Sequence, residues 1–177
     1  MNPVLVDRQE EFARSITLKA LDRSQRSRSQ LAELLARKDV PAEIAAAVLD
    51  RFEEVGLVDD RSLAEALVRT RHAERGLVGR ALAAELQSKG IDPLTAADAM
   101  AQITEEDELA AAERWAAKKL AMTRGLPTEK RLRQTGSLLM RKGHGTALAL
   151  STVKRLLAQE LAQENASAGD NARRQLQ

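Results

Sequence analysis

Apolar and polar residues alternate along the chain with the period of an α-helix. In the stretch after Pro41, apolar residues recur at spacings of four, four and three, namely at Ile44, Val48, Phe52 and Val55. The acidic residues of the same stretch fall on the opposite side, at Asp50, Glu53 and Glu54. This pattern predicts an amphipathic surface helix with an acidic outer face.

Capping residues and helix breakers predict where the helices begin and end. Ser27 and Gln30 have the spacing of a capping box, while Pro41 suits the first turn of a helix and Gly56 its end. Asp59 or Asp60 is expected to cap the next helix. That helix is predicted to turn four residues inward, at Leu63, Ala66, Leu67 and Thr70. We predict nine helices, with the first at about 8–22 and the last five at about 77–89, 93–104, 106–122, 128–142 and 146–162.

One phrase recurs at the end of three short helices. It reads LLARKDV at 34–40, LQSKGI at 86–91 and LMRKGHG at 139–145, and its lysines are Lys38, Lys89 and Lys142. The spacings of 51 and 53 residues predict three tandem three-helix repeats in an all-α, elongated and curved array. The expected boundaries are 8–57, 58–104 and 105–163, followed by a disordered tail at 164–177.

Composition excludes several classes of protein. Of 177 residues, 44% are hydrophobic, which is enough for a buried core, and cysteine is absent, which excludes disulfides and thiolate chemistry. No apolar run approaches the roughly 20 residues that cross a bilayer, and the first residues lack a signal-peptide pattern. We expect a soluble cytoplasmic protein without membrane contact. Aromatic residues make up only 2%, so contact with nucleic acid is expected through phosphates rather than by base stacking.

The net charge of +2 conceals strongly charged segments. In chain order, the net charges are +5 for 14–38, −6 for 39–60, +3 for 61–91, −7 for 92–113 and +10 for 114–155. Such segregation favours an edge that meets anionic nucleic acid or a partner of both signs. Solvated helix faces with pairs inside each helix are the alternative interpretation.

Four stretches of the chain resemble the RecX family. They are AVLDRFEEVGLVDDRSLAEALVRTR at 47–71, SRSQLAELLARKDVP at 27–41, LAAELQSKGI at 82–91 and LLMRKGHG at 138–145. In the first, Asp59 and Asp60 correspond to the family's Asp-Asp, and Leu63 and Ala64 to its Phe-Ala. The chain also departs from the family pattern at Asp39, where a glycine is usual, and at His144, where a phenylalanine is usual.

The resemblance implies three three-helix repeats and a regulatory rather than enzymatic role. Members of the family bind the filament that RecA recombinase forms on single-stranded DNA, lie along its groove and inhibit its activities. A monomer without cofactor is therefore expected here, with RecA-type filaments as partners and single- or double-stranded DNA as a direct partner. A sequence-nonspecific DNA- or RNA-binding protein and a pure protein scaffold are the alternatives.

Basic residues of the second and third repeats are the candidates for contact with recombinase or DNA, because arginine pairs well with carboxylate and phosphate. They are Arg69, Arg71, Arg75, Arg80, Lys89, Lys130, Arg131, Arg133, Arg141 and Lys142. Trp115, the only tryptophan, is expected to pack between repeats, with a partly exposed interface anchor as the alternative. We predict no catalytic, cofactor or metal site, because His72 and His144 lack partners at metal-ligand spacing.

Overall fold

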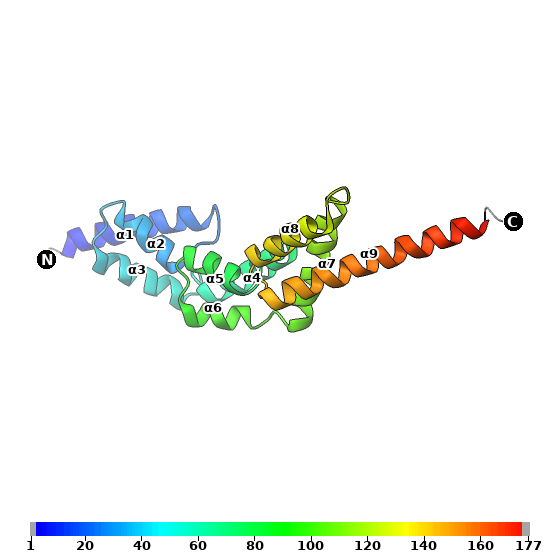
Figure 1. Cartoon of the computed structure of the whole chain (residues 1–177). Helices are drawn as coiled ribbons and strands as arrows, with labels where there is room; N and C mark the ends of the chain where they lie inside the picture. Colours follow the sequence, from blue (N-terminus) through cyan, green and yellow to red (C-terminus); the bar gives the residue numbers. More distant parts are fainter. Residues whose placement is uncertain (1–2, 175–177) are drawn as a thin grey trace. The chain divides into compact units, whose positions relative to one another are not determined.

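The computed structural model describes residues 3–174, and the regular structure within this range is entirely α-helical (Figure 1). The helices are α1 (Pro3–Leu21), α2 (Arg28–Ala36), α3 (Ala42–Glu54), α4 (Asp60–Arg75), α5 (Gly79–Ser88), α6 (Pro93–Met100), α7 (Glu105–Ala121), α8 (Thr128–Arg141) and α9 (Thr146–Arg174). The predicted all-α class is confirmed. None of these helices combines the length and apolar character needed to span a membrane.

The chain divides into two compact units. The N-terminal unit comprises the residues up to Thr70 together with Leu82–Gln102. The C-terminal unit comprises Arg71–Ala81 and the chain from Ile103 onward. Helices α4 and α5 therefore each contribute residues to both units, and the three repeats with the boundaries given above stay a prediction.

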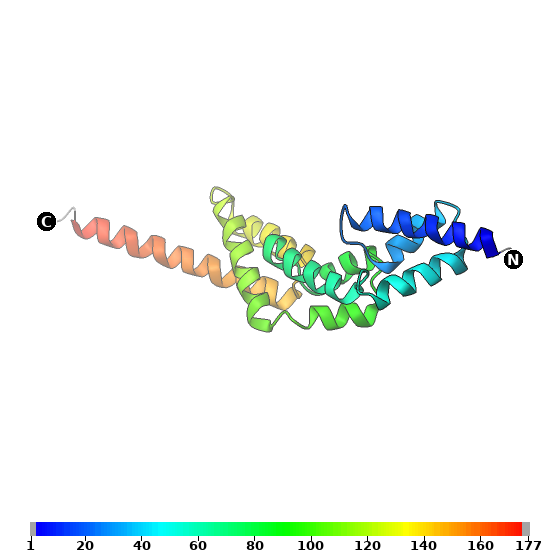
Figure 2. The same cartoon turned by 180° about the vertical axis from the view of Figure 1, so that it is seen from behind.

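In the N-terminal unit, α1, α2 and α3 pack against one another and lie side by side in both views (Figures 1 and 2). Three of the predicted inward residues of α3, Ile44, Val48 and Phe52, are 4–5% exposed and join one hydrophobic core with Leu31 and Leu35 of α2.

Two predicted inward positions are wrong. Val55 is 56% exposed, and it is the C-cap residue, one position beyond the last residue of α3. Thr70 of α4 is exposed, and the buried positions of that helix are Ala64 and Val68. The buried stripe of α4 is thus rotated by about one residue from the prediction.

In the C-terminal unit, α7, α8 and α9 pack against one another. Their core contains mostly small and aliphatic side chains, listed here in chain order: Ala112, Ala116, Leu120, Leu139, Ala149, Val153 and Leu157. Helix α9 continues to Arg174, through most of the segment expected to be a tail, and its outer part extends beyond the other two helices of the unit (Figures 1 and 2). The side chains at 161–168 are exposed, and residues 175–177 lie outside the described range.

The recurring phrase forms the same turn three times. After α2, the amide of Val40 bonds to the carbonyl of Leu35, and that of Asp39 to the carbonyl of Ala36. The same pair of bonds closes α5 at Gly90 and Ile91. This is the Schellman geometry of a helix C-terminus.

The third copy of the turn closes α8, where the amides of Gly143 and His144 make the equivalent bonds. The turn requires a left-handed residue, and φ is +58° at Asp39, +71° at Gly90 and +101° at Gly143. The next residue is buried each time, as valine, isoleucine and finally His144. A repeated sequence thus encodes a repeated local structure.

Candidate nucleic-acid interface

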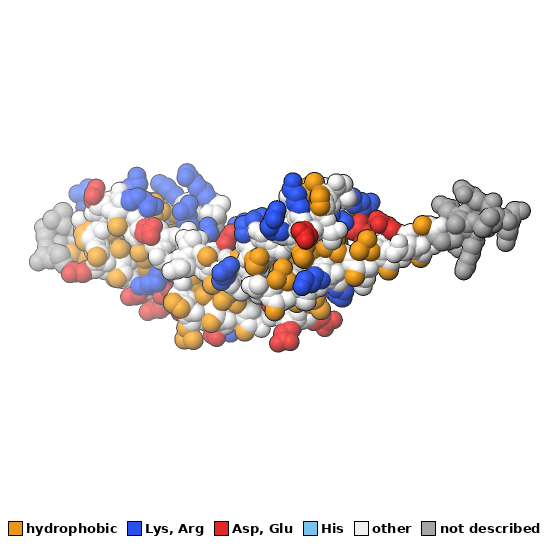
Figure 3. Space-filling view, viewed as in Figure 1, with side chains coloured by type: hydrophobic (Ala, Val, Ile, Leu, Met, Phe, Trp, Pro, Cys, Tyr) orange, Lys and Arg blue, Asp and Glu red, His pale blue; other side chains and the backbone are white. Residues whose placement is uncertain are grey.

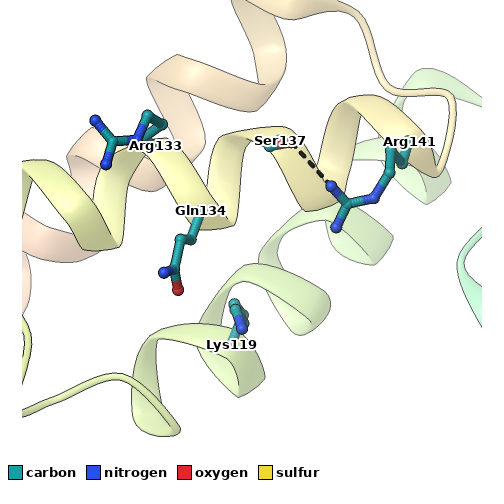
Figure 4. A pocket seen from close by; sticks show the side chains of 5 residues that line it. All are labelled: Lys119, Arg133, Gln134, Ser137 and Arg141. Atoms are coloured by element: carbon teal, nitrogen blue, oxygen red, sulfur yellow. Dashed lines mark hydrogen bonds between the residues drawn. The ribbon is translucent and has the colours of Figure 1, made fainter.

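An open groove of about 520 Å³ runs between α7 and α8 in the C-terminal unit. It is lined by Lys119 of α7 and by Arg133, Gln134, Ser137 and Arg141 of α8 (Figure 4). All of its charged lining residues are cations, and its two polar residues carry hydrogen-bonding groups. This composition suits an anionic ligand such as a phosphate.

The helical repeat of α8 explains how the groove forms. Arg133, Ser137 and Arg141 follow one another at spacings of four, so they share one face of the helix. The other face buries Thr135, Gly136 and Leu139. The Arg141 Nη1 donates a hydrogen bond of 2.9 Å to the Ser137 hydroxyl, which holds that guanidinium along the groove.

The cations of the groove lack a neutralising carboxylate among the side chains that the structure describes. Within residues 6–168, whose side chains the structure describes, no carboxylate forms an ion pair with Lys119, Arg133 or Arg141. By contrast, Arg28 of α2 is paired with Asp50 and Glu53, each at 2.6 Å. In the space-filling view, basic side chains gather over α8 (Figure 3). The groove therefore keeps its positive charge for a ligand.

Two of the sequence-predicted candidates line this groove, Arg133 and Arg141. Lys130 is exposed in the first turn of α8 and lies outside the lining. Lys119 was not predicted as a site residue, although it belongs to the strongly basic segment 114–155. Its position on α7 opposite α8 follows only from how the two helices pack.

Arg131, one of the basic candidates for contact with recombinase or DNA, is buried inside the unit. Arg131 is 8% exposed, and its Nη2 donates to the carbonyl of Leu120 at 3.0 Å and to Glu160 of α9 at 2.7 Å. This buried ion pair joins α8 to α9 inside the unit. Losing one partner of such a pair is costly because the other charge stays buried.

Lys142 is also engaged within the molecule. Its ammonium nitrogen lies 3.5 Å from the centroid of the Trp115 ring and donates a hydrogen bond to the carbonyl of Arg75. Burial lowers the pKa of Lys142, and the charges of Arg75, Arg114 and Lys118 lower it further. Lys142 therefore links the end of α8 to Trp115 of α7 and to the end of α4.

Trp115 packs on the turn that follows α4. A Cβ on Gly76 would lie 2.2 Å from the Trp115 Nε1, so only glycine fits beneath the ring. Gly76 falls in the second predicted repeat and Trp115 in the third, as the expected packing between repeats requires.

The basic candidates of the middle segment are divided between the two units. Arg69 is exposed and Lys89 half-buried in the N-terminal unit. In the C-terminal unit, Arg71 and Arg75 lie one turn apart on α4 and Arg80 is exposed at the start of α5.

The paired aspartates have separate structural roles. Asp59 accepts a hydrogen bond of 2.9 Å from the amide of Ser62 and another from its hydroxyl, and these bonds lower the pKa of Asp59. Asp60 instead accepts a hydrogen bond of 2.8 Å from the backbone amide of Arg28, at the start of α2. Burial raises the pKa of Asp60.

The predicted cap is thus Asp59, while Asp60 ties α4 to α2. The next two motif residues lie on the inner side of α4, with Leu63 half-buried and Ala64 fully buried. Among the residues described, no group of three His, Asp or Glu side chains is placed to hold a metal ion.

Comparison with known proteins identifies the family. A model of the first three-helix domain of RecX matches residues 13–52, and a model of the second matches residues 59–100. The regulatory protein RecX of Thermobifida fusca is 46% identical over 148 residues, which cover 84% of this chain and 80% of that protein. The regulatory protein RecX of Streptomyces coelicolor is 45% identical over 150 residues, covering 85% of this chain and 80% of that protein.

Solved structures agree at the level of the fold. The crystal structure of RecX from Lactobacillus salivarius superposes with a TM-score of 0.78 at 19% identity, covering 85% of this chain and 97% of that one. The family matches and the identity over most of both chains show that this chain belongs to the RecX family of regulatory proteins.

Proposed function

We propose that this chain binds the filament of a RecA-type recombinase on single-stranded DNA and inhibits its activities, namely ATP hydrolysis, strand exchange and filament extension. In this way it modulates DNA repair, homologous recombination and the SOS response. The observation that carries the proposal is membership of a regulatory family, over about four-fifths of the length of its relatives.

Inhibition by occlusion suits a chain of tandem helical repeats. Each repeat offers a separate set of contacts, and neighbouring recombinase subunits offer the same surface again along the filament. Once the first contact has formed, the later ones become intramolecular, so a polymer is bound more tightly than a free subunit. The bound chain then hinders the entry of a second DNA strand and the addition of subunits.

The cationic groove between α7 and α8 supports a contact with DNA within that filament. Lys119, Arg133 and Arg141 carry charges that no described carboxylate neutralises. The same observation favours the second candidate function, sequence-nonspecific binding of DNA or RNA through phosphates.

The ATPase activity of the cognate recombinase, stimulated by single-stranded DNA, separates the two functions. We expect inhibition at concentrations of this chain well below those that retard naked DNA. Inhibition only at concentrations that coat the DNA would favour the second function instead. An ATPase rate that does not change at any concentration would contradict the proposed regulation.

The role of the groove is tested by Arg133→Gln combined with Arg141→Gln. We expect about tenfold weaker binding to single-stranded DNA, and a salt dependence of the binding constant that is shallower by about 1.4, at about 0.7 per lost phosphate contact. The matched control removes two exposed cations outside the groove, by Arg8→Gln and Lys154→Gln. An unchanged salt dependence in a folded groove variant would remove the groove from the interface.

A further inference from the structure

Two apolar grooves of the N-terminal unit have the same construction. The first lies between α2 and α3 and measures about 400 Å³, and the second lies between α5 and α6 and measures about 440 Å³. Six lining positions of the first recur 51 residues later in the second, as the pairs Ala32 and Ala83, Ala36 and Gln87, Val40 and Ile91, Ala42 and Pro93, Ala45 and Ala96, and Leu49 and Met100.

Small side chains keep the first groove open. Its floor consists of the buried residues Val40, Ala45 and Leu49, and its walls are mostly alanines. At the rim, Arg28 is paired with carboxylates of α3, so this charged group does not enter the apolar space. The groove therefore offers a desolvated site for an aliphatic side chain with a polar edge around it.

The third repeat shows what kind of group fills this space. Gly136 of α8 lies 53 residues after Ala83, and Leu150 of α9 lies 53 residues after Ala97. The Leu150 Cδ2 is only 3.1 Å from the place that a Cβ on Gly136 would take, so this leucine fills the space between the two helices. The first two repeats have exposed alanines at the position of Leu150, namely Ala46 and Ala97.

We propose that each of the two grooves receives one leucine-sized aliphatic side chain from the recombinase, and that neighbouring subunits of the filament supply the two side chains. This inference rests on the proposed function. Two receptors of similar construction arranged in tandem match a partner whose surface repeats head to tail, as in a helical polymer. A symmetric dimer of this chain would instead pair a patch with itself.

Filling the grooves tests the proposal. Ala46→Leu adds to the lining of the first groove the side chain that Leu150 has in the third repeat. Ala97→Leu adds it at the corresponding position of α6, next to Ala96 of the second groove's lining. We expect each substitution to weaken binding to the preassembled filament about tenfold, and the pair to weaken it at least thirtyfold, because a filled groove excludes the partner's side chain and the second contact is intramolecular once the first has formed. Filament binding is measured by fluorescence anisotropy and by the midpoint of ATPase inhibition.

The matched control adds two leucines elsewhere, by Ala84→Leu and Ala110→Leu at exposed positions outside both grooves. Control and groove variants are expected to keep the parent's thermal unfolding and its affinity for naked single-stranded DNA. If filling the grooves unfolds the chain, Ala36→Glu and Gln87→Glu replace it, since these exposed wall positions bring a charge to each rim.

The outcomes separate the inference from the proposed function. A folded double variant that inhibits like the parent overturns the inference alone, and so does a loss that comes from one groove only. A parent dimer that the double variant abolishes in sedimentation assigns the grooves to a second copy and also overturns it. If the parent neither binds nor inhibits the filament, the proposed function falls and the inference with it.

Discussion

At two junctions between successive helical segments, the backbone carbonyl at corresponding positions accepts a hydrogen bond from different kinds of donor. In the N-terminal unit, the hydroxyl of Ser27 donates to the carbonyl of Lys89, at the end of α5. In the C-terminal unit, the amide of Val78 donates to the carbonyl of Lys142, at the end of α8, at 2.9 Å. Val78 lies 51 residues after Ser27, and Lys142 lies 53 residues after Lys89. One repeated junction is thus closed once by a side chain and once by the backbone.

The atoms around the glycine of each junction also differ, being side chain at the first junction and backbone at the second. A Cβ on Gly90 would meet the Cβ and hydroxyl of Ser29 at 2.4 Å, and both atoms belong to a side chain. A Cβ on Gly143 would lie 1.9 Å from the carbonyl oxygen of Val78, which is backbone. Because the Ser29 Cβ moves only with its backbone, both junctions require glycine, and the closer contact is the one at Gly143.

The largest expected effect comes from Gly143→Ala. We expect a loss of at least about 3 kcal/mol in the free energy of unfolding, because the added methyl group meets backbone at a residue with φ of +101°. Gly90→Ala is expected to cost less, since its added methyl group would lie 2.4 Å from the Ser29 side chain rather than 1.9 Å from a backbone oxygen. The free energies are measured by urea unfolding followed by circular dichroism.

Gly56→Ala is the control for backbone conformation alone. Gly56 has φ of +71°, but an added Cβ would meet nothing within 4 Å, so we expect a cost of about 1 kcal/mol. A Gly143 variant that loses no more than the Gly56 variant would contradict the rigid second junction.

Most of the helical pattern follows from local chemistry that the sequence displays. The capping box of Ser27 and Gln30, the proline that opens α6 and the left-handed Gly56 all act within a few residues. The rotation of the α4 stripe, which exposes Thr70, depends on which neighbours cover the helix. Such tertiary packing cannot be predicted from the periodicity of a single helix.

Ser27→Ala has the second-largest expected effect. It removes both the cap of α2 and the bond to Lys89, so we expect a loss of about 2 kcal/mol in the free energy of unfolding. Thr104→Ala removes the capping box of α7 and is the matched control, expected to cost about 1 kcal/mol. Equal losses in the two variants would show that the hydroxyl contributes nothing to the first junction.

The positive charge of the candidate site could be predicted from the sequence, but not all of the residues that line it. The +10 segment at 114–155 indicates a basic surface, and Arg133 and Arg141 line the groove. Arg131 differs from them by turning inward to Glu160, 29 residues later in the chain. Spacing along α8 places Arg131 on another face, but only the packing of α9 shows that this face is buried.

Between pH 5.5 and pH 7.5, a pH dependence of stability is expected at the second junction, because of His144. His144 occupies the buried position that Val40 and Ile91 hold in the other two turns. Burial lowers its pKa from 6.5, although Glu108, whose carboxylate lies 3.4 Å from Nδ1, opposes this, while the nearby His72 and Lys142 lower the pKa further.

Because the folded chain binds the His144 proton more weakly than the unfolded chain, stability falls as the pH drops below about 6.5. We expect a loss of about 1 kcal/mol in the free energy of unfolding between pH 7.5 and pH 5.5. His144→Phe is expected to abolish this loss, and His72→Gln to retain it. Urea unfolding at both pH values measures it, and a His144→Phe variant that keeps the pH dependence would refute the assignment.

The smallest expected effect distinguishes the two junction lysines. Lys142→Met removes an ammonium group that lies over the Trp115 ring and bonds to the carbonyl of Arg75. The attraction to the ring is partly offset by burial and by the neighbouring cations that lower the pKa of Lys142, so the expected loss is only about 0.5 kcal/mol. Lys89→Met, at the corresponding position of the first junction, is expected to cost less than that.

Since Trp115 is the only tryptophan, its fluorescence should change with Lys142→Met and not with Lys89→Met. If both variants leave the emission unchanged and lose equal stability, the aromatic contact does not distinguish the junctions, and their difference is confined to the glycine and the backbone bond.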